Sequence, residues 1–316
     1  MSGILVALGG NALQRAGGQG SWAEARTQMR ATVPVLAEVA SAGHTLVLTH
    51  GNGPQVGALL RQNEIAEREV PSRPLDVLGA ETQGQVGYLI QTELTPALRR
   101  RKVDRSILTV ISRTEVAADD PAFRNPSKPV GRYYSEEEAR LLRKQHGWSM
   151  TFDGARGGWR RLVPSPRPIR WLEGPAVRRL LDAGMGLQWI PVVTGGGGIP
   201  VVRRPNGTYE GVEAVIDKDR AAALVASELG LDTLAIVTDV PGAAIAFGKP
   251  GERWLGNVSR LELERLYRQG EFAEGSMGPK VQSGLEFLRS GGRRFLITDI
   301  PSLARALEGE AGTRVT

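Results

Sequence analysis

The 316-residue sequence has no cysteine and only three histidines. Without cysteine, the chain forms no disulfide, no zinc–thiolate site and no thiol nucleophile. The histidines, His44, His50 and His146, are not paired at the spacing of metal ligands. We therefore assign no metal ligands in the protein from the sequence, and we expect His50, which borders a glycine turn, to be structural.

Long apolar runs are also missing. No stretch approaches the ~20 apolar residues that cross a membrane. Residues 1–10 turn glycine-rich after five apolar residues and lack the basic region of a signal peptide, so they indicate a buried strand. We expect a cytoplasmic protein with no membrane partner.

Aromatic residues make up only 5% of the chain, whose net charge is +6. Basic pairs such as Arg160-Arg161 are scattered, and most lie beside acids. A nucleic-acid surface needs clustered positive charge and aromatic side chains on which bases stack. We therefore expect no nucleic-acid partner; the charge instead favours a small anionic substrate through electrostatic steering.

Lysine is scarce too, with six lysines against thirty-four arginines. Three of them stand in tight motifs: Lys128 in Asn125-Pro-Ser-Lys-Pro-Val-Gly131, Lys218 in Asp217-Lys-Asp219, and Lys280 in Gly275-Ser-Met-Gly-Pro-Lys280. A compact, mobile ammonium suits a phosphoryl group whose charge moves between oxygens during transfer. Asp217 and Asp219 would keep Lys218 charged and oriented, or they cap the helix that follows. These three lysines are candidate catalytic residues.

Short apolar strands alternate with amphipathic helices along most of the chain. Strands are predicted at 4–8, 45–49, 106–111, 187–193, 233–238 and 295–298, and helices at 22–42, 55–68, 77–100, 219–229, 259–269, 279–290 and from 302. Strands that are apolar on both sides form a parallel sheet covered on both faces. The pattern therefore predicts an α/β fold.

The alternation breaks at residues 115–174, which are rich in proline, arginine, glycine and aromatic residues. A structureless loop of ~60 residues is uncommon inside a compact domain. We expect an inserted lid subdomain there, made of hairpins and one helix near 135–146, within a single domain that spans 1–316.

Three glycine turns follow predicted strands: Gly9-Gly-Asn11, Gly51-Asn-Gly53 and Gly195-Gly-Gly-Gly198. Open α/β sheets bind ligands at the carboxyl ends of their strands. Glycine backbone lets several N–H groups converge on an oxyanion, and Asn11 and Asn52 could each donate an amide hydrogen bond. The turns predict one phosphate cradle, whose substrate-binding candidates are Gly9, Gly10, Asn11, Gly51, Asn52, Gly53, Gly196 and Gly197.

The common nucleotide motifs are absent. Gly248-Lys249 is followed by Pro250, so there is no P-loop, and the glycine run ends in Ile199-Pro200, so the dinucleotide fingerprint fails. Two other segments suit a nucleotide. Thr238-Asp-Val-Pro-Gly242 ends a strand in a turn, and Gly275-Ser-Met-Gly-Pro-Lys280 enters a helix whose free N–H groups attract anions.

Taken together, these motifs resemble the carbamate kinases, which have the amino-acid-kinase fold. The resemblance spans nearly the whole chain and rests on Ala7-Leu-Gly-Gly-Asn-Ala-Leu13, Thr49-His-Gly-Asn-Gly-Pro-Gln-Val-Gly57, Val163-Pro-Ser-Pro-Arg-Pro168, Glu213-Ala-Val-Ile-Asp-Lys-Asp219 and the motifs around Lys128, Gly195 and Lys280. It implies reversible transfer, carbamoyl phosphate + ADP ⇌ carbamate + ATP, with Mg²⁺ held mainly by the phosphates. It also implies a three-layer αβα sandwich with a mainly parallel sheet of about eight strands, a protruding subdomain and a homodimer.

The resemblance further implies a role for each motif. The glycine turns would hold carbamoyl phosphate, Lys128 would reach it from the subdomain, and Lys218 and Lys280 would neutralise the transferred phosphoryl group, with Asp217 and Asp219 orienting the lysines. The implied nucleotide-binding residues are Thr238, Asp239, Val240, Gly242, Phe247, Gly275, Ser276 and Met277. The chain has Pro241 and Ala244 where the family has an aspartate and a tyrosine, so the resemblance is weakest at the adenine.

Two other interpretations remain open. A sister kinase of the same fold would act on an acylamino acid, a nucleoside monophosphate or a small phosphate ester. A nucleotide sensor would bind without catalysis, but it would have lost the catalytic lysines, and all three are present.

Overall fold

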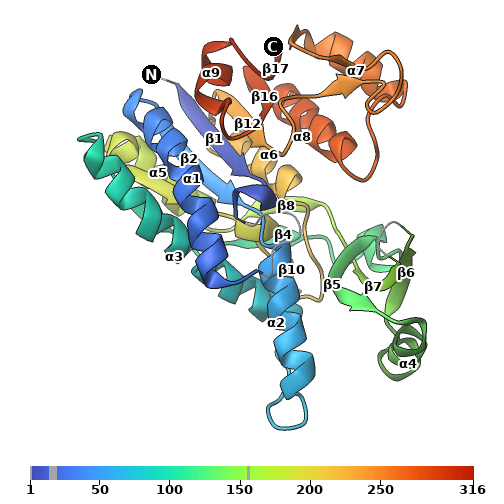
Figure 1. Cartoon of the computed structure of the whole chain (residues 1–316). Coiled ribbons are helices and arrows are strands. Elements are labelled where there is room, and N and C mark those ends of the chain that lie inside the picture. The colour runs from blue at the N-terminus through green and yellow to red at the C-terminus, as the bar shows by residue number, and fades with distance from the viewer. Residues whose placement is uncertain (1, 14–19, 155–156) are drawn as a thin grey trace.

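The computed structural model describes residues 2–13, 20–154 and 157–316. Its body is a sandwich around an eight-stranded sheet (Figure 1). In spatial order the strands are β15 (Asn257–Val258), β17 (Thr313–Val315), β16 (Arg294–Thr298), β12 (Thr233–Val237), β1 (Gly3–Leu8), β2 (Thr45–His50), β9 (Trp189–Val192) and β3 (Ser106–Thr109). Among these described strands, only β16 and β17 pair antiparallel. The predicted, mainly parallel α/β sheet is confirmed.

Helices cover both faces of this sheet. Strand residues alternate between the faces, so Ile4 and Val6 of β1 join one buried cluster while Leu5 and Ala7 join the other. The first face is covered by α1 (Trp22–Ser41), α3 (Leu75–Arg100) and α9 (Leu303–Glu308), and the second by α5 (Gly174–Asp182), α6 (Lys218–Glu228), α7 (Arg260–Arg268) and α8 (Met277–Arg289). This is the predicted three-layer sandwich. Among the described helices, none has the length and apolar composition of a membrane span.

A second, smaller sheet was not predicted. Its order is β11 (Tyr209–Gly211), β10 (Ile199–Arg203), β4 (Arg113–Val116) and β8 (Pro168–Trp171). β10 and β11 form a hairpin that turns through Asn206-Gly207, with Gly207 at a φ of 84°. β4 and β8 pair antiparallel at the two ends of the predicted insertion. The part of the chain that stands away from the body therefore runs from 117 to 167.

We call residues 117–167 the subdomain. Its described part holds a three-stranded sheet, β5 (Lys128–Tyr134), β7 (Gly158–Val163) and β6 (Ser149–Asp153), and the helix α4 (Glu136–His146). Figure 1 shows it projecting from the body beside α2 (Gly53–Ala66). A small buried cluster joins the two parts: Val56 and Leu75 from the body, Val130 and Val163 from the subdomain.

Gly284 marks a close approach between a helix and the main sheet. A Cβ atom placed on Gly284 of α8 would lie 2.1 Å from Cε1 of Phe295, a fully buried residue of β16. Gly284→Ala should therefore lower the free energy of unfolding by about 1–3 kcal/mol through overpacking. Chemical denaturation measures this loss.

The matched control is Gly79→Ala in α3, because a Cβ atom there would meet nothing within 4 Å. Alanine should raise stability at Gly79 by up to ~1 kcal/mol through helix propensity. Equal effects at both glycines would contradict the packing described for α8.

Candidate active site

The three predicted glycine turns meet at the carboxyl ends of β1, β2 and β9. Gly10 opens a 3-10 turn (Gly10–Ala12), Gly53 is the first residue of α2, and Gly195 opens a second 3-10 turn (Gly195–Gly197). A Cβ atom placed on Gly51 would lie 3.4 Å from Cδ of Lys218 and 3.7 Å from N of Gly10. The first two turns and the Lys218 motif are thus neighbours, as one phosphate cradle requires.

The third turn packs directly on the second. Gly196 has a φ of 67°, and a Cβ atom there would lie 2.1 Å from Nδ2 of Asn52. Asn52 is buried and donates from Nδ2 to Oγ1 of Thr82, at 2.8 Å. Its amide, predicted to face the substrate, therefore has a partner in α3. The side chain of Asn11 lies outside the part of the chain that the structure describes.

His50 supports these turns from inside the body. A Cβ atom placed on Gly195 would lie 2.4 Å from Nε2 of His50, whose Nδ1 is 2.9 Å from the carbonyl oxygen of Gly51. Burial lowers the pKa of His50 to about 4, and the contact with Gly51 only partly opposes the shift. The ring is therefore neutral near pH 7, which suits the structural role that we expected.

The charged centre of the site is Asp219, whose side chain is only 4% exposed. One carboxylate oxygen accepts from Nζ of Lys218 at 2.5 Å, and the other accepts from Nζ of Lys280 at 3.1 Å. Lys218 comes from the first turn of α6 and Lys280 from the first turn of α8. A single carboxylate thus holds two ammonium groups that lie far apart in the sequence.

Asp217 caps α6, one of the two functions that the sequence left open, but its described ion pair is with Lys128 and not with Lys218. As the N-cap of α6, its Oδ1 accepts from the backbone N–H groups of Asp219 and Arg220 at 2.9 and 3.3 Å. Its Oδ2 accepts from Nζ of Lys128 at 2.8 Å. Burial alone would raise the pKa of Asp217, but Lys128, Lys218 and the helix N–H groups outweigh burial and hold that pKa well below its ordinary value. Asp217 is therefore ionised at neutral pH and binds the subdomain lysine.

A cavity of about 390 Å³ opens beside the two buried lysines, at the ends of β1, β12 and β16. It is lined by Gly9, Gly10, Ala12, Gln28, Lys218, Val237, Thr238, Asp239, Lys280, Asp299, Ile300 and Pro301. Two cavities of about 420 and 900 Å³ lie against the subdomain, and neither has a lysine in its lining. The lysine-lined cavity is therefore the candidate active site.

Asp299, which lines this cavity, is a candidate site residue that was not predicted. It directly follows β16, and its Oδ1 accepts from the N–H of Ser302 at 2.9 Å. The predicted strand at 295–298 could have identified it, because residues just after parallel strands gather at the ligand edge of the sheet.

The remaining nucleotide candidates, beyond Thr238 and Asp239, do not line this cavity. Gly242 is buried, and a Cβ atom there would lie 2.7 Å from Oγ1 of Thr313, so its place is set by packing. Phe247 is 59% exposed and meets Trp254 edge to face, with ring centroids 5.9 Å apart. The two rings lie at the hairpin of β13 (Ala244–Ile245) and β14 (Arg253–Trp254). Trp254 was not predicted.

Three of the other four nucleotide candidates surround the start of α8. Gly275 and Ser276 are exposed, and Met277 is the first helical residue. Ser276 makes no side-chain cap, but the N–H of Gly278 donates to the carbonyl oxygen of Ala273 at 2.9 Å and Pro279 has no N–H, so the first turn is only partly open to an anion. The N–H of Ala246 donates to Oε2 of Glu271 at 3.3 Å, which ties the aromatic hairpin to the segment leading into α8. Val240 is half-buried in the turn after β12.

Comparison with known proteins agrees with this geometry. The model of the Amino acid kinase family matches residues 3–299. The carbamate kinase of Pyrococcus horikoshii is 45% identical over 315 residues, 99% of this chain and 98% of the relative. That of Thermococcus kodakarensis is 46% identical over 318 residues, 100% of this chain and 99% of the relative.

Solved structures agree as well. The structure of carbamate kinase from Giardia lamblia bound to AMP-PNP superposes with a TM-score of 0.91 at 39% identity, covering 99% of this chain and 98% of that one. With matches along its whole length in sequence and in fold, the chain belongs to the amino acid kinase family and, within it, to the carbamate kinases.

Proposed function

We propose that this chain catalyses reversible phosphoryl transfer between ATP and carbamate, carbamoyl phosphate + ADP ⇌ ATP + carbamate. One observation carries the proposal: Asp219 holds Lys218 and Lys280 together at the cavity edge, beside the glycine turns. The relatives named as carbamate kinases support the choice of substrate.

The chemistry needs positioning and charge, and no covalent nucleophile. In the direction of ATP formation, the bond between phosphorus and the carbamate oxygen breaks, and a bond forms to a β-phosphate oxygen of ADP. Backbone N–H groups of the glycine turns hold the acyl phosphate, apart from those of Gly51, Gly197 and Gly198, which donate to backbone carbonyl oxygens. Lys218 and Lys280 offset the charge on the transferred group, and Asp219 keeps both ammonium groups in place throughout.

Mg²⁺ is part of this proposal. Among the described residues, no group of three or more histidine, aspartate or glutamate side chains could hold a metal ion by itself. Asp239 and Asp299 line the cavity, and Mg²⁺ is commonly bound by one or two carboxylates together with substrate phosphates. These two residues would hold the ion against the nucleotide, where its charge offsets that of the phosphates.

We also propose that the enzyme is a cytoplasmic homodimer. Trp22 of α1 and Tyr88 of α3 stack with ring centroids 5.9 Å apart, and both are exposed on the outer face of the sandwich. Exposed aromatic residues are enriched at protein interfaces. Light scattering should give twice the monomer mass of 34.0 kDa.

The activity assay separates this proposal from its alternative, a sister kinase of the same fold. Purified protein is mixed with ADP, Mg²⁺ and either carbamoyl phosphate, an acylamino-acid phosphate or a small phosphate ester, and ATP is measured. ATP from carbamoyl phosphate alone supports the proposal. ATP from another donor, with none from carbamoyl phosphate, overturns it.

Lys218→Ala and Lys280→Ala should each lose about 100-fold or more in kcat, because one well-placed charged donor is worth ~2.7–4 kcal/mol in the transition state. Coupled ATP formation measures the loss, and circular dichroism verifies the fold. Lys144→Ala, at an exposed position of α4, is the control and should stay near wild type. Both site variants retaining more than about a tenth of wild-type kcat would refute the assignment.

Lys128→Ala should raise KM for carbamoyl phosphate by about tenfold and lower kcat, because a charge-assisted contact is lost. KM for ADP should change by no more than a few-fold, since Lys128 reaches the site from the subdomain, opposite the nucleotide. Steady-state kinetics with each substrate varied in turn measures both constants. If Lys128→Ala weakened only ADP binding, the subdomain would lie over the nucleotide, which would contradict its assignment to carbamoyl phosphate.

We propose that the subdomain is a lid, within the insertion predicted at 115–174. Its apolar contact with the body is small, and it carries Lys128 to the site. Closing lids exclude water and complete catalytic sites. Hydrogen exchange in β5 and β7 should slow when carbamoyl phosphate and ADP are added. Equal, strong protection with and without ligand would show that no lid closes.

A further inference from the structure

The linker between β11 and α6, residues 212–217, is where the body meets the subdomain next to the catalytic lysines. Among the described residues it makes three polar contacts with the subdomain, besides apolar packing. Glu213 pairs with Arg161 at 2.9 Å, the N–H of Val215 donates to the carbonyl oxygen of Pro164 at 2.9 Å, and Asp217 accepts from Lys128. Lys218 follows immediately, so one short segment contacts the subdomain and carries a catalytic residue.

The side chain of Glu213 also binds the start of α3 in the body. Its Oε1 accepts from the backbone N–H of Leu75, the first residue of α3, at 2.7 Å. The N-cap of α3 is Pro74, which makes no side-chain cap. One carboxylate oxygen of Glu213 therefore caps α3, although the two are far apart in the sequence, and the other oxygen pairs with Arg161. Glu213 thus connects the body to the subdomain.

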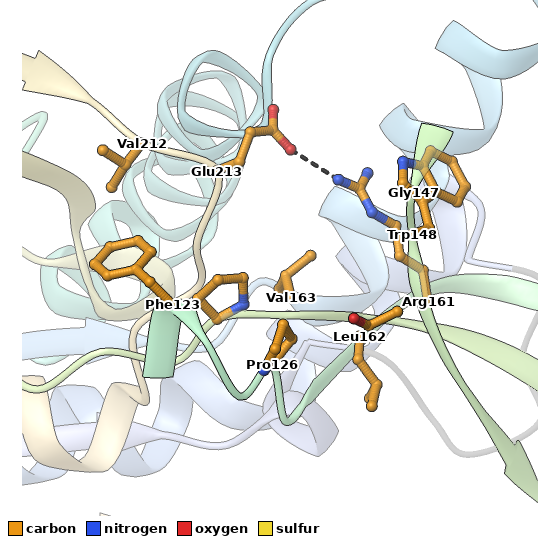
Figure 2. A pocket seen from close by; sticks show the side chains of 11 residues that line it. Phe123, Pro126, Gly147, Trp148, Arg161, Leu162, Val163, Val212 and Glu213 are labelled. Atoms are coloured by element: carbon orange, nitrogen blue, oxygen red, sulfur yellow. Dashed lines mark hydrogen bonds and ion pairs between the residues drawn. The ribbon is translucent and has the colours of Figure 1, made fainter. Parts of the chain in front are cut away.

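Arg161 is held firmly on the subdomain side. Its guanidinium lies over the Trp148 ring, 4.2 Å from the centroid, and its side chain is 14% exposed. Figure 2 shows the Glu213 carboxylate pointing at this guanidinium, between Val163 and Trp148. Arg161 is itself a residue of β7, so a change in its position would also move β7 and the two strands that pair with β7.

The same strands carry Lys128. In the β5–β7 ladder, Val130 lies opposite Arg161 and Lys128 lies opposite Val163. Residues two apart in a strand point to the same face, so Arg161, Val163, Val130 and Lys128 share the face that looks at the body. Val130 and Val163 are buried against the body. At the margins of this face, Arg161 pairs with Glu213 and Lys128 pairs with Asp217.

We propose that Glu213 is a positioning residue for the transfer reaction: through Arg161 and the β5–β7 ladder, it sets where Lys128 stands relative to Asp217 and the acyl phosphate. The inference rests on the proposed function for its kinetic consequence. The structural consequence, that Glu213 fixes the subdomain on the body, is independent of what the enzyme phosphorylates.

Glu213→Gln tests the proposal, because the amide oxygen can still accept from Leu75 while the charge opposite Arg161 is gone. A small misplacement of a catalytic group is costly, so kcat/KM for carbamoyl phosphate should fall about tenfold with KM for ADP within twofold. In a Lys128→Ala background, the same change should cost less than about twofold, since Glu213 acts through Lys128. Equal losses in both backgrounds would overturn the proposal.

Two further variants complete the test. Arg161→Gln breaks the same pair from the subdomain side and should give the same split between the two substrates, which covers the case that Glu213→Gln does not fold. Glu173→Gln is the matched control, because Glu173 also accepts one backbone N–H and one arginine, both from Arg113, but within the body. This control should leave the kinetics unchanged.

Hydrogen exchange gives a readout that needs no activity. In the ligand-free protein, β5 and β7 should exchange faster in Glu213→Gln than in the wild type and in Glu173→Gln. Unchanged exchange together with unchanged kinetics would show that Glu213 only caps α3. If wild-type protein forms no ATP from carbamoyl phosphate, the proposed function fails. Faster exchange in Glu213→Gln would still show that Glu213 connects the subdomain to the body.

Discussion

The site depends on one buried carboxylate that holds two lysines. Asp219 is nearly inaccessible, and each of its oxygens binds a different ammonium group. A lone buried charge is costly, but a paired and hydrogen-bonded charge is tolerated. With one negative and two positive charges, the group keeps a net positive charge beside the glycine turns. The sandwich supplies the two helix N-termini, α6 and α8, from which Lys218 and Lys280 reach the same acid.

The contrast between the body and the subdomain follows from how each is held. The body buries large apolar clusters on both faces of its main sheet. The described contact between the subdomain and the body has two small apolar clusters, which include Val130, Val163 and Phe123 of the subdomain, and partly exposed ion pairs. An exposed ion pair contributes little stability, up to about 1 kcal/mol, so the Glu213–Arg161 pair sets the position of the docked subdomain without making its opening costly. This interface can therefore open and reclose at low cost while the lysines on the body stay fixed.

Much of the fold could be predicted because its strands are apolar on both sides and end in glycine, as at 4–8 and 45–49. The second sheet was missed because β4 and β8 are short and polar on one side. Long-range partners leave no local signal: nothing in the sequence near Asn52 reveals Thr82, and nothing near Phe247 reveals Trp254. Lysine scarcity identified three residues that the structure brings to one place. The role of Glu213 could not be predicted, because it depends on contacts with residues 52 and 138 positions away in the sequence.

The most direct test of this account is the kcat of Asp219→Asn, measured as ATP formation with circular dichroism as the check on folding. If one carboxylate positions both lysines, its loss should lower kcat by about 100-fold or more, at least as much as the loss of either lysine, because neither ammonium group keeps its place. A folded Asp219→Asn enzyme with kcat within a few-fold of wild type would contradict the account, since the lysines would then be positioned by other contacts.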